Sequence, residues 1–386
     1  MIEELKNRLR EIDWEYPEKN VTELMKKIEW QTIVFKQYEI QPPLDWKDYI
    51  YYWLTQFDGD GRILIAMKLI NNIIFIDVDL YRELQKYTYQ ELKDYVHYAM
   101  GMEIEDFLRQ TLFFPVDGSG EVHLIDFMRI NRIKGRKDRV GGRLYLDEPD
   151  ILLEPIKSIE KLQNLRERIL EMNMREDEKE FIDTILYSYE LDMRKRIEEL
   201  KKRYKTRKYL CIVTDFVGTG TTIIKDIRRI IKYYENFEKI FVVDYVGTEC
   251  GLEKIQEESQ DKIETIICGL ELPDYLRVFS EENTYFTDEE KNEIKCICDA
   301  YFSRFFHPDI EKFGDKIKYG YIGNEHSCGN SLLLTLYTNC PNNSLPILWA
   351  GSYKYYNYPN KWIPLFERVP SYVYHIVGGG KYDRQR

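Results

Sequence analysis

The segment 209–224 constrains the fold more than any other part of the chain. It begins with a short apolar run, Tyr209 to Val213, of the kind that a strand buried on both faces shows. Thr214 and Asp215 follow this run, and a turn rich in glycine and threonine then leads into an apolar-periodic segment over 223–234. The order predicts a parallel strand, a tight turn and a helix behind it, with polar groups at the edge where open α/β sheets bind ligands.

The turn itself reads Gly218-Thr219-Gly220-Thr221-Thr222. Glycine lets backbone N–H groups converge without a Cβ in the way, threonine hydroxyls add donors, and a helix N-terminus adds positive partial charge. The carboxylate just upstream can accept hydrogen bonds from sugar hydroxyls. The segment therefore predicts a phosphate site beside a sugar contact, against the simpler alternative of a tight strand–helix turn with no ligand.

Other phosphate-binding motifs fit this segment less well. The Walker loop ends in Gly-Lys-Ser/Thr, and no lysine stands in the turn. A dinucleotide fingerprint starting at Gly218 places its third glycine at Ile223, although Asp244 at the end of the next apolar run is a candidate ribose acid. A methyltransferase-like motif requires glycine two residues after Asp215, at the position of Val217. The dinucleotide interpretation remains a third, weaker alternative.

From Leu210 to Thr222 the chain resembles the ribose-phosphate loop of type I phosphoribosyltransferases. The shared pattern is four apolar residues, two acid positions, two apolar residues and a small Thr/Gly-rich turn. In that family both acids contact the ribose hydroxyls of phosphoribosyl pyrophosphate, and the turn amides hold its 5′-phosphate. The chain departs from the pattern at the first acid position, which is Thr214.

The resemblance implies a role for each of these residues. Asp215 would be the catalytic residue and contact a ribose hydroxyl, and Thr214 would hydrogen-bond a hydroxyl without adding charge. The phosphate would be wrapped by Gly218, Thr219, Gly220, Thr221 and Thr222. Mg²⁺ would be held mainly by ligand phosphates and water. No metal site made of protein ligands is predicted.

Two later stretches sharpen the resemblance. Gly329-Asn330 and Thr338-Asn-Cys-Pro-Asn-Asn-Ser-Leu-Pro-Ile-Leu-Trp349, together with the phosphate turn, resemble phosphoribosyltransferase-like proteins with a C-terminal extension. Such proteins occur in bacterial anti-phage gene clusters, including some retrons, which implies a cytoplasmic defence component that acts on nucleotides with a partner protein or ribonucleoprotein. The extension motif has four residues that either lie near the site or merely end a strand: Asn339, Pro341, Asn342 and Asn343.

An earlier strand-like run, 111–116, is followed by a second small-residue turn. By position Gly118, Ser119 and Gly120 are candidates for a loop that grips pyrophosphate, and a plain turn is the alternative. The basic run 134–143 is interpreted as a solvated loop rather than as a mobile cover. Asp117 and His123 are the nearest candidates for a general base.

The fold class predicted is α/β, a type I phosphoribosyltransferase-like parallel sheet with helices on both faces. Residues 1–105 are expected to be a helical N-terminal region, in which 73–76 forms either a strand or a helix–helix connection. The α/β core is expected over 106–270 with a helical insertion at about 151–205, and an α+β extension over 271–386.

Composition limits the partners. The formal net charge of -11 opposes a broad nucleic-acid footprint. No apolar run approaches the length of a membrane span, the opening is charged rather than signal-like, and the seven cysteines are odd in number, so a reducing cytoplasm and no disulfide framework are expected. Cys296-x-Cys298 and His326-x-Cys328 lack a second paired ligand set for zinc.

Two functions follow. The first is an enzyme of ribosyl transfer or nucleotide hydrolysis, with phosphoribosyl pyrophosphate or a nucleotide as the ligand and the acceptor or base left open. The second is an inactive sensor of a ribose phosphate that signals to a partner, which the uncharged Thr214 favours. Turnover that is lost in Asp215→Asn supports the enzyme, and binding without turnover supports the sensor.

Overall fold

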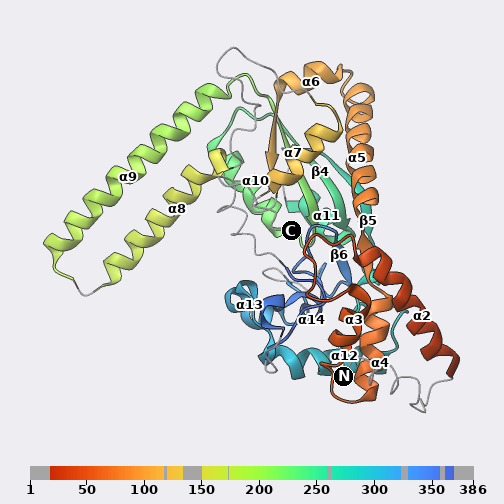
Figure 1. Cartoon of the computed structure of the whole chain (residues 1–386). Coiled ribbons are helices and arrows are strands. Elements are labelled where there is room, and N and C mark those ends of the chain that lie inside the picture. Colours follow the sequence, from red (N-terminus) through yellow and green to blue (C-terminus); the bar gives the residue numbers. More distant parts are fainter. Residues whose placement is uncertain are drawn as a thin grey trace. The chain divides into compact units, whose positions relative to one another are not determined.

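A computed structural model describes residues 18–116, 120–133, 150–172, 174–258, 262–322, 329–356 and 361–368. The chain divides into two compact units. The first unit comprises residues 1–84, 247–251 and 270–386, and the second comprises 85–246 and 252–269. Each is described on its own. Figure 1 shows the course of the chain.

A four-stranded sheet forms the centre of the second unit. Its strands are β2 (Thr111–Pro115), β3 (Tyr209–Val217), β4 (Lys239–Thr248) and β5 (Ile263–Leu272), in the spatial order β2-β3-β4-β5. β2 and β3 run parallel, with Thr111 opposite Tyr209 and Pro115 opposite Val213. α10 (Thr221–Tyr233) joins β3 to β4, and α11 (Glu249–Glu258) joins β4 to β5. The predicted alternation of strand and helix is thus present.

Apolar side chains that alternate along the strands build two cores. On one face Leu210, Ile212 and Val242 pack in a buried cluster with Ile156 of α8 (Asp150–Glu171) and Ile227 of α10. Because successive strand residues point to opposite faces, the intervening aromatic residues form the second core.

On the second face, α5 (Val78–Tyr98), α6 (Ile104–Gln110) and α7 (Gly120–Ile130) supply the aromatic partners. Phe107 of α6 lies 5.0 Å from Phe241, and Phe127 of α7 stacks on Tyr245 at 6.1 Å, both distances between ring centroids. The parallel sheet with helices on both faces confirms the fold class predicted from the sequence.

A helical hairpin of α8 and α9 (Glu176–Arg203) fills the predicted insertion, and its two helices lie side by side in Figure 1. Arg166 of α8 joins them through Asp183 at 2.8 Å and Glu190 at 2.6 Å. The first turns of α8, including Ile156, and the last turns of α9, including Ile197, pack in the buried core of the sheet.

The first unit has an aromatic core between helices from both ends of the chain. Its elements are α2 (Glu18–Phe35), α3 (Trp46–Leu54), α4 (Asp60–Asn71), β1 (Ile74–Ile76), α12 (Asp288–Tyr301), α13 (Pro308–Phe313), β6 (Leu334–Leu336) and α14 (Pro346–Trp349), with short 3-10 turns at Asp274–Leu276, Phe302–Arg304, Gly314–Ile317 and Tyr353–Tyr355. Trp53, Trp349 and Trp362 are fully buried there.

The strand alternative for 73–76 is the one that forms, because β1 pairs in parallel with β6 and places Ile74 opposite Leu334. The first unit therefore joins segments that the sequence assigned to separate regions. The boundaries 1–105, 106–270 and 271–386 stay a prediction about domains. No helix among the described residues is long and apolar enough to cross a membrane.

Candidate functional site

Asp215 lies near the end of β3 and meets a histidine from α7. The Nε2 atom of His123 is 2.9 Å from Oδ2 of Asp215, and the two side chains are only 5% and 16% exposed. α7 begins soon after β2, and β2 pairs with β3, so the sheet topology brings the start of α7 to this strand. The sequence indicated His123 only as one of two candidates for a general base, with Asp117. The pairing with Asp215 was not predicted.

β4 holds His123 from a second side. The hydroxyl of Tyr245 donates to the carbonyl of His123 at 3.3 Å, and the Tyr245 ring stacks on Phe127 one helical turn further along α7. Burial raises the pKa of Tyr245 well above its usual value, so the phenol stays a donor. These contacts fix the position of the α7 backbone beside Asp215.

A second carboxyl group, Asp244, lies on the neighbouring strand and is fully buried. Burial is the main cause that raises its pKa well above the usual value, and the negative charge of Asp215 adds to the effect. The Cys268 thiol lies 3.8 Å from its Oδ2 atom. A buried carboxyl that favours its protonated form leaves no exposed acceptor for a ribose, which argues against the dinucleotide interpretation.

The predicted phosphate turn joins β3 to α10. Gly220 is the N-cap residue, with φ at 68°, in the left-handed region that glycine adopts without strain, and its carbonyl accepts the first helical bond from the Ile224 amide at 3.0 Å. Because Gly220 has no side-chain oxygen, it cannot cap the N–H groups of the first turn of α10. The Thr219 and Thr221 hydroxyls lie 3.0 Å apart. This arrangement suits an anion.

Thr214 is buried, at 3% exposed, one residue before Asp215 in β3. Since strand side chains alternate, the two residues point to opposite faces of the sheet. Thr214 therefore shares a face with Ile212, which packs in the core with α8 and α10. Its role as a sugar contact stays a prediction.

The remaining predicted residues divide into two sets. Gly118 and Ser119, with Asp117 and the basic run 134–143, lie outside the described residues, and Gly120 is the first residue of α7. Asn339, Pro341, Asn342 and Asn343 belong to the first unit. Asn339 Oδ1 accepts from the Cys340 amide at 3.1 Å, and Asn343 Nδ2 donates to the Tyr321 carbonyl at 3.1 Å. These amides shape a turn; their proximity to a ligand stays a prediction.

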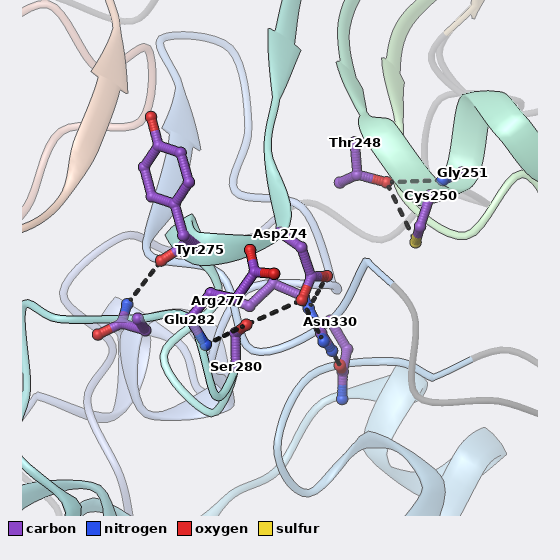
Figure 2. A network of polar contacts seen from close by, with 10 residues as sticks. Thr248, Cys250, Gly251, Asp274, Tyr275, Arg277, Ser280, Glu282 and Asn330 are labelled. Carbon is purple, nitrogen blue, oxygen red and sulfur yellow. Dashed lines mark hydrogen bonds and ion pairs between the residues drawn. The ribbon is translucent and has the colours of Figure 1, made fainter.

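A polar network in the first unit holds the Gly329-Asn330 stretch (Figure 2). The guanidinium of Arg277 donates to Asp274 Oδ2 at 2.8 Å and to Asn330 Oδ1 at 3.1 Å, and the Ser280 hydroxyl donates to the same Asp274 oxygen at 2.8 Å. The hydrogen bonds from the Arg277 guanidinium are the main cause that lowers the pKa of Asp274. Because these side chains bond to one another, we interpret the network as structural.

The described residues contain no group of three or more His, Cys, Asp or Glu side chains that could hold a metal ion. The Cys296 side chain is exposed and that of Cys298 is buried, as expected for positions two apart on a helix, and His326 and Cys328 lie outside the described residues. Of the six cysteines among the described residues, five are free thiols and Cys250 is disulfide-bonded, a disulfide that the odd number of cysteines did not predict.

A family model, PRTase-CE, matches residues 50–368, which is most of the chain. The chain belongs to the PRTase-CE family. The match includes Asp215, the phosphate turn and the extension motif, and it spans β1 and β6 as well as the four-stranded sheet. It confirms the resemblance inferred from the sequence. No curated protein and no solved structure matches the chain.

Proposed function

We propose that this PRTase-CE protein binds phosphoribosyl pyrophosphate, or another nucleotide with a ribose 5-phosphate, at Asp215 and the 218–222 turn. The observation that carries the proposal is the order of polar features along β3 and the start of α10. A nearly buried carboxylate, Asp215, lies near the end of β3, and a glycine-capped helix N-terminus follows within a few residues. A phosphate on the turn would leave its sugar within reach of the carboxylate.

The pairing of Asp215 with His123 bears on the chemistry. A carboxylate 2.9 Å from the Nε2 atom of His123 holds the imidazole ring in one orientation. The ring is thereby placed to give a proton to a leaving oxygen or nitrogen on the anomeric carbon of a bound sugar. We infer transfer or hydrolysis at that carbon as the reaction.

Mg²⁺ is expected to enter the site with the ligand. Asp215 is engaged by His123. Mg²⁺ would therefore be held by ligand phosphates and water, where it neutralises the charge of the pyrophosphate.

A specific observation favours a second candidate, a sensor without turnover. Thr214 stands where a second acid would support positive charge on the sugar, and it is buried and neutral.

Family membership further supports a role in bacterial anti-phage defence, in the cytoplasm, with a partner protein or a ribonucleoprotein. Loss of phage protection in cells that carry Asp215→Asn at normal protein levels would support that role, and unchanged protection would contradict it.

Calorimetric titration with phosphoribosyl pyrophosphate and Mg²⁺ tests the site. Asp215→Asn is expected to weaken binding by about tenfold or more, which corresponds to about 1.4 kcal/mol. The matched control is Asp192→Asn on α9, an exposed aspartate whose loss should change nothing. Absence of binding by the wild type, or equal binding by Asp215→Asn, would refute the site.

The same samples separate enzyme from sensor. Release of pyrophosphate or free base, abolished in Asp215→Asn and reduced in His123→Gln, identifies an enzyme. Binding that remains dependent on Asp215, without release of either product across a panel of bases and nucleotides, identifies a sensor.

A further inference from the structure

A buried glutamine of α5, Gln85, lies beside a residue that holds His123 in place. Gln85 is 1% exposed, and neither its Nε2 nor its Oε1 atom makes a hydrogen bond of regular geometry. A buried amide without such bonds lowers the stability of a fold, because its hydration is lost and nothing replaces it. The group therefore calls for an explanation outside folding, and a catalytic role is one such explanation.

The Tyr245 hydroxyl is the polar partner within reach of this amide. Burial raises the pKa of Tyr245 well above its usual value, and the interaction with the Gln85 amide opposes this effect. The hydroxyl has one hydrogen, which it donates to the His123 carbonyl at 3.3 Å, so the amide can meet the hydroxyl oxygen only as a donor. The terminal torsion of a glutamine is broad in energy, so rotation of the amide can bring Nε2 into this bond.

Two further contacts fix α5 against α7. Asn131, just after the end of α7, donates from Nδ2 to the Gln85 carbonyl at 3.0 Å. One helical turn along α5 from Gln85, the Tyr89 ring meets Phe127 of α7 edge-on, with 5.8 Å between the ring centroids. Because His123 and Phe127 are four residues apart, they lie on the same face of α7. α5 thus packs on the face of α7 that carries His123.

We propose that Gln85 is a positioning residue for the reaction at the anomeric carbon, and that it acts through Tyr245 to fix where α7 places the ring of His123. The inference rests on the proposed function, because the pairing of His123 with Asp215 gives the contact its chemical meaning. The amide donates to the Tyr245 oxygen, Tyr245 donates to the His123 carbonyl, and the imidazole stays 2.9 Å from the carboxylate. Loss of the amide therefore loosens His123 without removing a group that contacts the ligand.

Gln85→Leu tests this role, because leucine is similar in size and has neither a donor nor an acceptor. Its thermal midpoint by circular dichroism should equal or exceed that of the wild type, since an amide without regular bonds is replaced by an apolar side chain. Release of pyrophosphate or free base should fall by about threefold to tenfold, as for the loss of one ordinary hydrogen bond. The dissociation constant for phosphoribosyl pyrophosphate with Mg²⁺ should stay unchanged. Gln90→Leu, at an exposed glutamine of α5, is the matched control.

NMR of isotope-labelled histidine gives a readout that does not need turnover. The sequence has five histidines, and the signal of His123 is the one lost in His123→Gln. Gln85→Leu should move that signal and change its pH titration, whereas Gln90→Leu should not. In a Tyr245→Phe background, Gln85→Leu should have no further effect on the signal or on turnover, because the two residues act in one chain of contacts.

An unchanged His123 signal in Gln85→Leu overturns the proposal, as does a full effect of that change in the Tyr245→Phe background. A lower thermal midpoint together with equal losses of binding and turnover also overturns it, because such a result shows a role in folding alone. Failure of the wild type to bind phosphoribosyl pyrophosphate refutes the proposed function instead, and the His123 signal then still decides whether Gln85 acts through Tyr245.

Discussion

His307 of the first unit should make the stability of that unit depend on pH. The residue precedes α13 as its N-cap, and its Nδ1 atom accepts from the Asp309 amide at 3.1 Å. Its Nε2 atom lies 3.2 Å from the Arg368 carbonyl, which can only accept, so Nε2 carries the proton. Both nitrogens of the neutral ring are thereby satisfied, and a second proton would break the bond at Nδ1.

Burial, followed by the positive charge of Arg368, lowers the pKa of His307 from 6.5 to about 4. Between these two values the unfolded chain binds a proton that the folded chain does not. The stabilising contribution is therefore complete above about pH 6.5 and is lost as the pH falls toward 4. From the two pKa values, the loss between neutral pH and pH 5 is about 2 kcal/mol.

Urea denaturation followed by tryptophan fluorescence measures this effect in the right unit. The buried tryptophans Trp46, Trp53, Trp349 and Trp362 belong to the first unit, and the sequence of the second unit contains none. His307→Asn retains a side chain that can cap α13 and removes the titration, so its unfolding free energy should fall by about 2 kcal/mol less than that of the wild type between pH 7.5 and pH 5.

His97→Asn is the matched control, because that histidine is exposed on α5 in the second unit. It should leave the pH dependence of the wild type unchanged. Equal pH dependence in wild type and His307→Asn would refute the reasoning, since it would mean that the folded protein protonates His307 as readily as the unfolded chain does.

Three further changes test the site and the cores by the same denaturation method, with circular dichroism as the signal for the second unit. Gly220→Ala forces a side chain into a left-handed conformation and should cost on the order of 1 kcal/mol, together with weaker phosphate binding; an unchanged stability would contradict the turn geometry. Asp244→Asn replaces a carboxyl that favours its proton and should cost less than about 1 kcal/mol at pH 7, whereas a loss of several would indicate an ionised group. Trp362→Ala opens a cavity in the first unit and should cost about 3 to 5 kcal/mol, and a loss under about 1 would contradict its full burial.

The sequence predicted the elements around β3 because each left a local signal. Each signal is contained in a few neighbouring residues: the apolar run of β3, the glycine at the start of α10 and the periodic segment after it. The family also followed from short motifs, at 213–222 and 338–349, that lie inside the matched region. The helical insertion was predicted from long helical stretches in which acidic and basic residues are interleaved.

What the sequence did not predict are contacts between distant segments. His123 and Asp215 are 92 positions apart, and their meeting depends on β2 pairing with β3 across the whole hairpin insertion. The pairing of β1 with β6 joins residues that are 260 positions apart, Ile74 and Leu334, and short three-residue strands carry almost no periodic signal. Both depend on tertiary context that no single window of sequence contains.

These contacts also change what the substitution at the first acid position means. Thr214 is neutral, and the buried carboxyl of Asp244 favours its protonated form, so of these three strand residues Asp215 is the one suited to carry negative charge toward a sugar. Less negative charge gives less support to a positive anomeric carbon, and departure of the leaving group then depends more on its protonation. In the proposed reaction, His123, which is paired with the remaining carboxylate, is the group that supplies that proton. On this reasoning His123→Gln should reduce turnover most for substrates with poorly stabilised leaving groups, and equal losses for good and poor leaving groups would contradict the role of His123 as the acid.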